Sequence, residues 1–376
     1  MSDLASIVEG SRVVVCCGSG GVGKTTTAAV LALEAARQGR RSVVVTIDPA
    51  RRLADALGLE GLTNTPSRID ADMPGEMHAL MLDTKSTFDG LVRRHSATAE
   101  QAEGILENRF YQNISSALSG TQEYMASEKL YELAEEGDWD LVVVDTPPTR
   151  NALDFLDAPQ RLAHFLDHRL YKVLMTPTRG IVRAVNVAAQ AVVRSMSKVV
   201  GGDVVADAIA FFRAFEGMEQ GFKERAAAVD RLLAAPETAF ILVASPKADT
   251  VAEASYFAEQ LAEHGIDVRG LVVNRMQPAF GTDDEGLALG PDAARERANT
   301  LAGTDLGDLY TALADARQLA RGEEDHLVGL TERVSPAPVV RVPVQPFEVN
   351  DLDGLHVLGG FMLGGAVDDP AEANGD

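Results

Sequence analysis

A glycine-rich run that ends in a lysine and two threonines carries the clearest chemical signature of this chain. Residues 18–25 read Gly-Ser-Gly-Gly-Val-Gly-Lys-Thr and fit the phosphate-binding pattern G-x-x-x-x-G-K-[ST]. Glycines let consecutive backbone N–H groups surround a phosphate, and a helix that starts at the loop adds positive potential. The lysine can reach the β- and γ-phosphates, while the threonine hydroxyl can coordinate Mg²⁺. We therefore predict that a nucleotide is bound by Gly20, Gly21, Val22, Gly23, Lys24, Thr25 and Thr26.

Two aspartates each follow an apolar run that is typical of a strand. Asp48 comes after residues 43–47, and Asp145 comes after residues 141–144. Ligands of open α/β sheets lie at the carboxyl ends of the strands. An acid there can orient or deprotonate a water that faces the γ-phosphate, or can hold Mg²⁺ directly or through water. We expect Asp48 and Lys24 to act in catalysis, and Thr25 and Asp145 to hold Mg²⁺.

The loop and the aspartates must be positioned by a sheet. Seven apolar runs alternate with helical patterns, and continuous apolar runs suit strands that are buried on both faces of a parallel sheet. We therefore predict an α/β fold of the P-loop NTPase type, with a doubly wound, mostly parallel sheet of about seven or eight strands. The runs are residues 13–17, 43–47, 79–82, 141–144, 240–244, 271–273 and 339–344.

The stretch between residues 144 and 240 contains no convincing strand pattern and indicates a helical insertion. A Gly-, Asp- and Pro-rich stretch at residues 277–291 is expected to form a mobile loop. The predicted organisation is a nucleotide-binding core at 1–153 and 234–365, a helical insertion at 154–233 and a disordered acidic tail at 366–376.

Composition excludes several classes of function. The formal net charge of −22 argues against nonspecific binding to nucleic acid or to an anionic membrane surface. The two cysteines, Cys16 and Cys17, are adjacent within a predicted strand, which excludes a CxxC zinc clip and an Fe–S cluster held by this chain alone. Neither a signal sequence nor an apolar span of membrane length is found. We expect a cytoplasmic protein without zinc or an Fe–S cluster.

Basic residues gather in the predicted insertion. Between residues 161 and 200, seven basic side chains accompany the single acid Asp167, which gives a local charge of +6. Apolar side chains are interleaved with them. An amphipathic helix with a solvated basic face explains the pattern, and so does a surface for an apolar partner helix or anionic lipid heads. Residues 161–222 are therefore a candidate surface for a hydrophobic client or a membrane-protein segment, and peripheral attachment to a membrane stays open.

Three segments together resemble the ArsA family, which comprises arsenical-pump ATPases and the guided-entry ATPases that deliver tail-anchored membrane proteins. The segments are Gly-Gly-Val-Gly-Lys-Thr-Thr at 20–26, Asp-Pro-Ala at 48–50 and Asp-Thr-Pro-Pro-Thr at 145–149. Asn274, after two valines, resembles the adenine-reading asparagine of the family. Residues 342–349, which contain Pro346 and Phe347, resemble its adenine loop.

The resemblance implies a dimeric ATPase that binds ATP or ADP with Mg²⁺. It makes Asp48 the switch I acid, places Asp145 in switch II, and puts the insertion where guided-entry ATPases form a hydrophobic client groove. The family's zinc-binding and arsenite-binding cysteines are missing here, which excludes a zinc-bridged dimer and disfavours an arsenical pump.

Ser19 is the most consequential departure from the family. Its relatives belong to the deviant Walker A branch and carry a signature lysine at this position, which crosses the dimer interface to the nucleotide of the opposite subunit. A serine hydroxyl is too short and uncharged for that role. Three explanations account for a serine at this position. Catalysis is slow, or another cation such as Arg51 or Arg52 substitutes for the lysine, or a lysine-bearing paralogue supplies the charge in a heterodimer. We favour the heterodimer over a homodimer, because the chain resembles the paired ArsA-like paralogues of actinobacteria.

The favoured function is a Mg²⁺-dependent ATPase whose nucleotide state controls a helical partner-binding surface, with membrane-protein targeting or transport as candidate roles. A low-turnover, nucleotide-gated scaffold or regulatory subunit is an alternative. A MinD- or ParA-like positioning ATPase is another, although those proteins also use the signature lysine. The run Ser-Pro-Lys-Ala-Asp at 245–249 echoes the [NT]-K-x-D guanine motif of GTPases but lacks its Asn or Thr. ATP is therefore expected over GTP.

Overall fold

The computed structural model describes most of the chain outside the predicted insertion. No helix among these residues is both long and apolar enough to cross a membrane. The described residues are 3–48, 52–114, 121–147, 155–161, 164, 207, 210, 211, 213, 214, 217–278, 280 and 289–364.

Eight strands form one sheet in the order β3-β4-β2-β5-β1-β6-β7-β8. All neighbouring pairs are parallel except β3 with β4, which are antiparallel. The predicted doubly wound, mostly parallel sheet is confirmed, and each of the seven apolar runs overlaps a strand. The strands are β1 Val13–Gly18, β2 Arg41–Thr46, β3 Ser67–Arg68, β4 Glu76–Met81, β5 Leu141–Asp145, β6 Thr238–Ala244, β7 Val268–Met276 and β8 Val339–Pro343.

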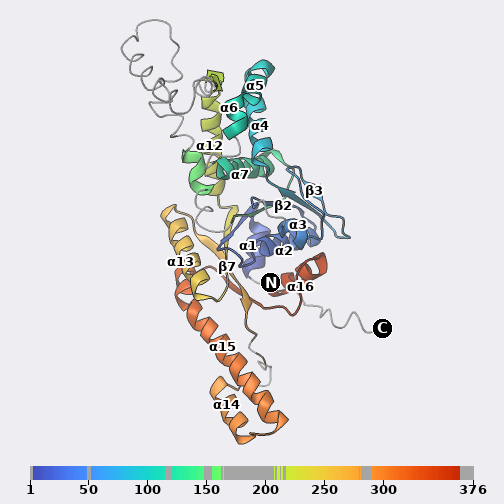
Figure 1. The fold of residues 1–376 in the computed structure, drawn as a ribbon, viewed down its shortest axis with the longest axis vertical. Coiled ribbons are helices and arrows are strands. Elements are labelled where there is room, and N and C mark those ends of the chain that lie inside the picture. Colours follow the sequence, from blue (N-terminus) through green and yellow to red (C-terminus); the bar gives the residue numbers. More distant parts are fainter. Residues whose placement is uncertain are drawn as a thin grey trace.

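Helices cover both faces of the sheet (Figure 1). The central strands β1, β5 and β6 are buried along their whole length, because their apolar side chains meet helices on either side. One face packs against α1, α2, α3 and α16, and the other against α7, α12, α13 and α15. These helices are α1 Asp3–Gly10, α2 Lys24–Arg37, α3 Arg52–Ala56, α7 Thr121–Tyr131, α12 Glu219–Leu233, α13 Ala248–Glu263, α15 Asp305–Val334 and α16 Leu352–Leu363.

A helical lobe stands at one end of the sheet, and a helical arm extends from the other (Figure 1). The lobe has its own apolar cluster, which unites residues of α4, α5, α6, α7 and α12. The arm consists of the 30-residue helix α15 with α14 packed at its far end. The remaining elements are α4 Thr84–His95, α5 Ala99–Leu106, α6 Arg109–Ile114, the π-helical turn η1 Glu132–Glu136, and α14 Pro291–Thr300.

The helical lobe draws on two separate parts of the sequence. Leu91, Ile105 and Tyr111 come from before the predicted insertion, while Phe222 and Ala226 of α12 come from its last part. Most of residues 161–222, the predicted partner surface, lie outside the described residues, as do most of 277–291 and the tail 366–376. The domain boundaries and the partner surface therefore stay predictions.

Candidate active site

Two glycines shape the loop that joins β1 to α2. Gly18 has a φ of 149°, and a Cβ atom there would lie 2.0 Å from the carbonyl oxygen of Val243 on the adjacent strand β6. Gly23 has a φ of 100°, and its Cβ would lie 2.2 Å from Nδ2 of Asn274. Gly23 is also the N-cap of α2, and no described side chain caps this end. The first N–H groups of α2 therefore suit an anionic ligand, as the motif predicts.

Lys24 folds back over its own loop. The residue is only 6% exposed, and its Nζ donates a hydrogen bond to the backbone oxygen of Ser19 at 2.7 Å. Burial lowers the pKa of Lys24, and the charge of Asp145 acts against that shift. The side chain of Ser19 is itself buried, and its Oγ has no hydrogen-bond partner among the described residues. Position 19 therefore does not extend from the surface in this conformation.

Asp145 lies at the centre of the site. β5 is flanked by β1 and β2, so its last residue is aligned with Cys16 on one side and Thr46 on the other. Its Oδ2 accepts hydrogen bonds from the hydroxyl groups of Thr25 at 2.8 Å and Thr46 at 2.9 Å. Its Oδ1 is buried and has no partner among the described residues. A buried carboxylate oxygen without a partner, beside a threonine hydroxyl, fits a site for a hard cation such as Mg²⁺.

Burial raises the pKa of Asp145 to about 6, although the hydrogen bonds from Thr25 and Thr46 act in the opposite direction. If Asp145 holds Mg²⁺ as predicted, the ion would bind the ionised carboxylate, and binding would release a proton whenever Asp145 is protonated. We predict that the affinity for Mg²⁺-nucleotide is nearly constant above pH 7 and falls about tenfold between pH 7 and pH 5. Calorimetric titration at a series of pH values measures this.

The nucleotide itself also titrates, and Thr46→Val provides the control. This variant removes one hydrogen bond that stabilises the ionised form of Asp145, so the midpoint of the pH profile should move to higher pH. A midpoint that is identical in both proteins would show that Asp145 does not set the profile.

Asp48 lies beside this cluster, two residues after the end of β2. Its Oδ2 is 3.4 Å from a guanidinium nitrogen of Arg52, and its charge acts on both Lys24 and Asp145. The structure thus brings together the predicted catalytic and metal-binding side chains. Residues 49–51 and 148–150, the rest of the two predicted switch segments, lie outside the described residues.

The residues predicted to contact the base lie at the ends of β7 and β8. Asn274 donates from Nδ2 to the backbone oxygen of Val22 in the phosphate loop at 2.9 Å. Beyond β8 the chain continues alongside β7, because Val344 N donates to the oxygen of Met276. Pro346 and Phe347 follow directly and are exposed. The two predicted base elements therefore come from adjacent strands.

Sequence reasoning missed Thr46 and Gln122. The Thr46 hydroxyl is the second donor to Asp145, and its position at the polar end of an apolar run was the available signal. Gln122 donates from Nε2 to the backbone oxygen of Ile47, next to Asp48, at 3.0 Å. These residues are 75 positions apart, so no local pattern indicates this contact.

The run at residues 245–249, which echoes the guanine motif of GTPases, makes contacts within the protein. The Oδ1 of Asp249 accepts from the backbone N–H of Thr250 at 2.8 Å, in the first turn of α13. The oxygen of Pro246 lies 3.3 Å from Nδ1 of His326 on α15. These contacts fix the start of α13.

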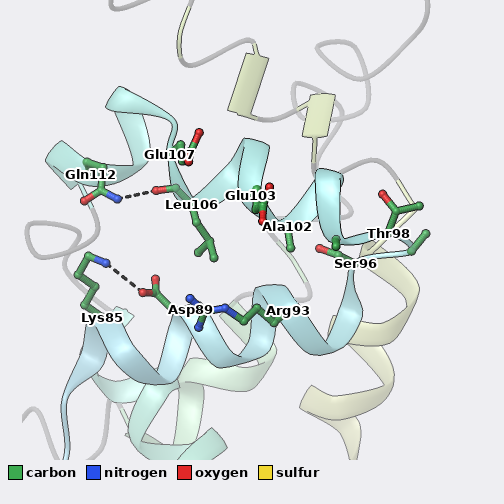
Figure 2. Close-up of a pocket in the computed structure, with 12 residues that line it drawn as sticks. Lys85, Asp89, Arg93, Ser96, Thr98, Ala102, Glu103, Leu106, Glu107 and Gln112 are labelled. Atoms are coloured by element: carbon green, nitrogen blue, oxygen red, sulfur yellow. Dashed lines mark hydrogen bonds and ion pairs between the residues drawn. The ribbon is translucent and has the colours of Figure 1, made fainter.

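A cavity of about 720 Å³ lies in the helical lobe, between α4 and the α5–α6 segment (Figure 2). Charged side chains line it, among them Lys85 and Asp89, which form an ion pair at 3.0 Å. None of the phosphate-loop residues lines this cavity. It is therefore separate from the site around Asp145.

A glycine loop between the first strand and its helix, followed by an acid at the end of the adjacent strand, is the arrangement of P-loop nucleoside triphosphatases. The fold and the site place this chain in that class. Residues 11–288 match the sequence profile of the ArsA family, described as anion-transporting ATPases. The match spans most of the chain, which therefore belongs to the ArsA family, as the resemblance predicts.

Individual relatives are similar over much of this chain. ATPase GET3 of Malassezia globosa is 26% identical over 263 residues, which cover 70% of this chain and 72% of the relative. The ATPase ASNA1 homolog of Dictyostelium discoideum is 27% identical over 262 residues, with coverage of 69% and 70%. The arsenical pump-driving ATPase of Acidiphilium multivorum is 25% identical over 278 residues, which cover 72% of this chain and 40% of the relative.

Proposed function

We propose that this chain is a Mg²⁺-dependent ATP hydrolase of the cytoplasm. The observation that carries the proposal is the position of Asp145, whose buried carboxylate accepts from Thr25 of the phosphate loop and keeps one oxygen without a described partner. Family membership and the names of the relatives, which are ATPases, support the same activity.

In the proposed mechanism the loop amides and the Nζ of Lys24 hold the β- and γ-phosphates of ATP. Thr25 and Asp145 would hold Mg²⁺, which neutralises charge that develops on the phosphate oxygens. Asp48 orients the attacking water and accepts its proton. The water oxygen forms a bond to the γ-phosphorus while the bond from that phosphorus to the β–γ bridging oxygen breaks, which releases ADP and inorganic phosphate.

Adenine is proposed to lie near Asn274, Pro346 and Phe347. The exposed ring of Phe347 is 37% accessible and offers an apolar surface to a base. The guanine-like run lacks the Asn or Thr of the GTPase motif, and Oδ1 of its Asp249 accepts from the adjacent backbone N–H of Thr250. These features favour ATP over GTP.

We further propose that α7 carries the nucleotide state to the helical lobe. Gln122, in the first turn of α7, holds the backbone next to Asp48. Further along α7, the buried Glu128 accepts from Nε of Arg225 on α12 at 2.8 Å. Loss of the γ-phosphate would displace the segment that contains Asp48. That displacement would pull on α7, which is ion-paired to α12 of the lobe.

Gln122→Ala tests this route. In the unaltered chain we expect a non-hydrolysable ATP analogue with Mg²⁺ to change amide hydrogen exchange in α12. In the variant that change should fall by about half or more, while affinity for the analogue stays within about threefold, because the one hydrogen bond that is lost goes to the backbone of Ile47 and not to a group assigned to the phosphates.

Gln112→Ala is the matched control, since Gln112 also donates from its amide to a backbone oxygen, that of Leu106, but within the lobe. The control should keep the full response of α12. An unchanged response in Gln122→Ala would contradict transmission through α7.

The buried side chain of Ser19 favours a cation supplied from outside this protomer. We propose a dimer, with a lysine-bearing paralogue as the preferred partner and a hydrophobic client at residues 161–222.

Phosphate release tests the proposed activity and partner. It is measured with Mg²⁺-ATP for the full chain alone and for the chain mixed with that paralogue, and again with GTP in place of ATP. Turnover that is undetectable in every mixture, or faster with GTP, would contradict the proposal.

A further inference from the structure

Arg275 has an unusual backbone and an unusual neighbour. Its φ is 62°, and within the described part of the chain it is the only non-glycine residue with a positive φ. It also lies where the pairing of β7 with β8 shifts register, between Asn274 and Met276. Irregularities of this kind re-aim side chains near functional sites. The Nη1 atom of Arg275 donates to the backbone oxygen of Gly21, in the phosphate loop, at 3.0 Å.

Asn274 and Arg275 together hold two consecutive carbonyl groups of the loop. Asn274 binds the oxygen of Val22 at 2.9 Å, and Arg275 binds that of Gly21. The Oδ1 of Asn274 accepts from the backbone N–H of Arg275 at 2.9 Å, which fixes the two residues relative to each other.

These contacts determine where the loop amides point. In a planar trans peptide, the C=O and N–H groups point in opposite directions. Holding the oxygens of Gly21 and Val22 toward β7 therefore turns the N–H groups of Val22 and Gly23 away from β7. Consecutive amides that point the same way form the cradle that a phosphate needs.

We propose that Arg275 is a positioning residue that fixes the phosphate loop in its binding conformation before the nucleotide arrives. It acts through the Gly21 carbonyl rather than by touching phosphate. The left-handed conformation disfavours residues with a Cβ atom, and the contact with the loop accounts for an arginine at this position. This inference rests on the proposed use of the loop as the ATP site.

The test compares Arg275→Gly, Arg275→Lys and the control Arg269→Ala in the full chain. Glycine tolerates the backbone conformation, so the loss is confined to the guanidinium. Arg269 is an exposed arginine at the opposite end of the same strand. The measurements are the Kd for Mg²⁺-ADP, the KM and kcat for ATP, and the Tm without nucleotide.

For Arg275→Gly we expect the Kd and the KM to rise about tenfold, as for the loss of a charge-assisted hydrogen bond, with kcat within about twofold of the unaltered chain. The Tm should not fall. Arg275→Lys should recover part of the affinity, because a lysine can still donate to the carbonyl. Arg269→Ala should match the unaltered chain.

A Kd for Arg275→Gly within about twofold of the unaltered value would overturn the proposal. So would a lowered Tm with parallel losses in KM and kcat and no recovery by lysine, since these indicate a purely structural role. If the unaltered chain itself does not bind Mg²⁺-ADP, the proposed function fails. That failure differs from a failure of the Arg275 proposal alone, because then no variant would bind Mg²⁺-ADP.

Discussion

Replacing Asp48 by asparagine is expected to lower ATP turnover about a hundredfold or more, in the range found for loss of a general base. Asparagine keeps the shape of the side chain but cannot accept the proton of the attacking water. Asp48 lies close enough to Lys24 and Asp145 for its charge to act on both, which is the position that a group facing the γ-phosphate must have. Steady-state phosphate release measures the effect.

Nucleotide affinity should separate this role from a general loss of structure. The Kd for a non-hydrolysable ATP analogue should stay within about threefold in Asp48→Asn, because Asp48 is assigned to the water and not to the phosphates. Asp55→Asn, an exposed carboxylate on the adjacent helix α3, is the matched control and should keep full turnover. Unchanged turnover in Asp48→Asn, measured in the assembly that hydrolyses ATP, would show that the assigned role is wrong.

Replacing Lys24 by methionine is expected to weaken nucleotide binding about a hundredfold or more, since it removes the one charged side chain that the loop offers to the phosphates. Methionine has a similar length, and within the described part of the chain the Lys24 Nζ donates one hydrogen bond, to its own loop at Ser19. The Tm without nucleotide should therefore change little. Calorimetric titration with Mg²⁺-ADP measures the loss.

The matched control is Lys247→Met. Lys247 is exposed and belongs to the guanine-like run, so it would bind nucleotide only if that run acted as in GTPases. We expect its affinity to equal that of the unaltered chain. Binding that is lost in Lys247→Met and retained in Lys24→Met would reverse the assignment of the nucleotide site.

The strands could be predicted because burial on both faces of a parallel sheet requires continuous apolar runs. Residues 141–144, for example, are all valine or leucine and are buried throughout β5. β3 was not predicted, since this edge strand consists of two exposed residues, Ser67 and Arg68, paired to β4. An element so short and exposed leaves no pattern of hydrophobicity. The composition of the helical lobe was also not predicted, because its apolar cluster joins residues more than one hundred positions apart, such as Leu91 and Phe222.

The candidate site could be predicted where its chemistry lies in one short motif. Lys24 and Thr25 follow from the loop, and Asp145 from the strand before it. The contacts that hold the phosphate loop and the backbone next to Asp48 could not be predicted, because they join distant segments: Arg275 is 254 positions from Gly21, and Gln122 is 75 positions from Ile47. Only the fold brings such pairs together, and the backbone conformation of Arg275 has no sequence signature.

The central claim is that the loop at residues 18–25, with Asp145, forms a single Mg²⁺-dependent site for ATP. Calorimetric titration of the full chain with a non-hydrolysable ATP analogue, with Mg²⁺ and after chelation of Mg²⁺, tests this most directly. The predicted result is one site per chain whose affinity falls about tenfold or more on chelation. Binding that is absent, or that is equally strong without Mg²⁺, would contradict the assignment.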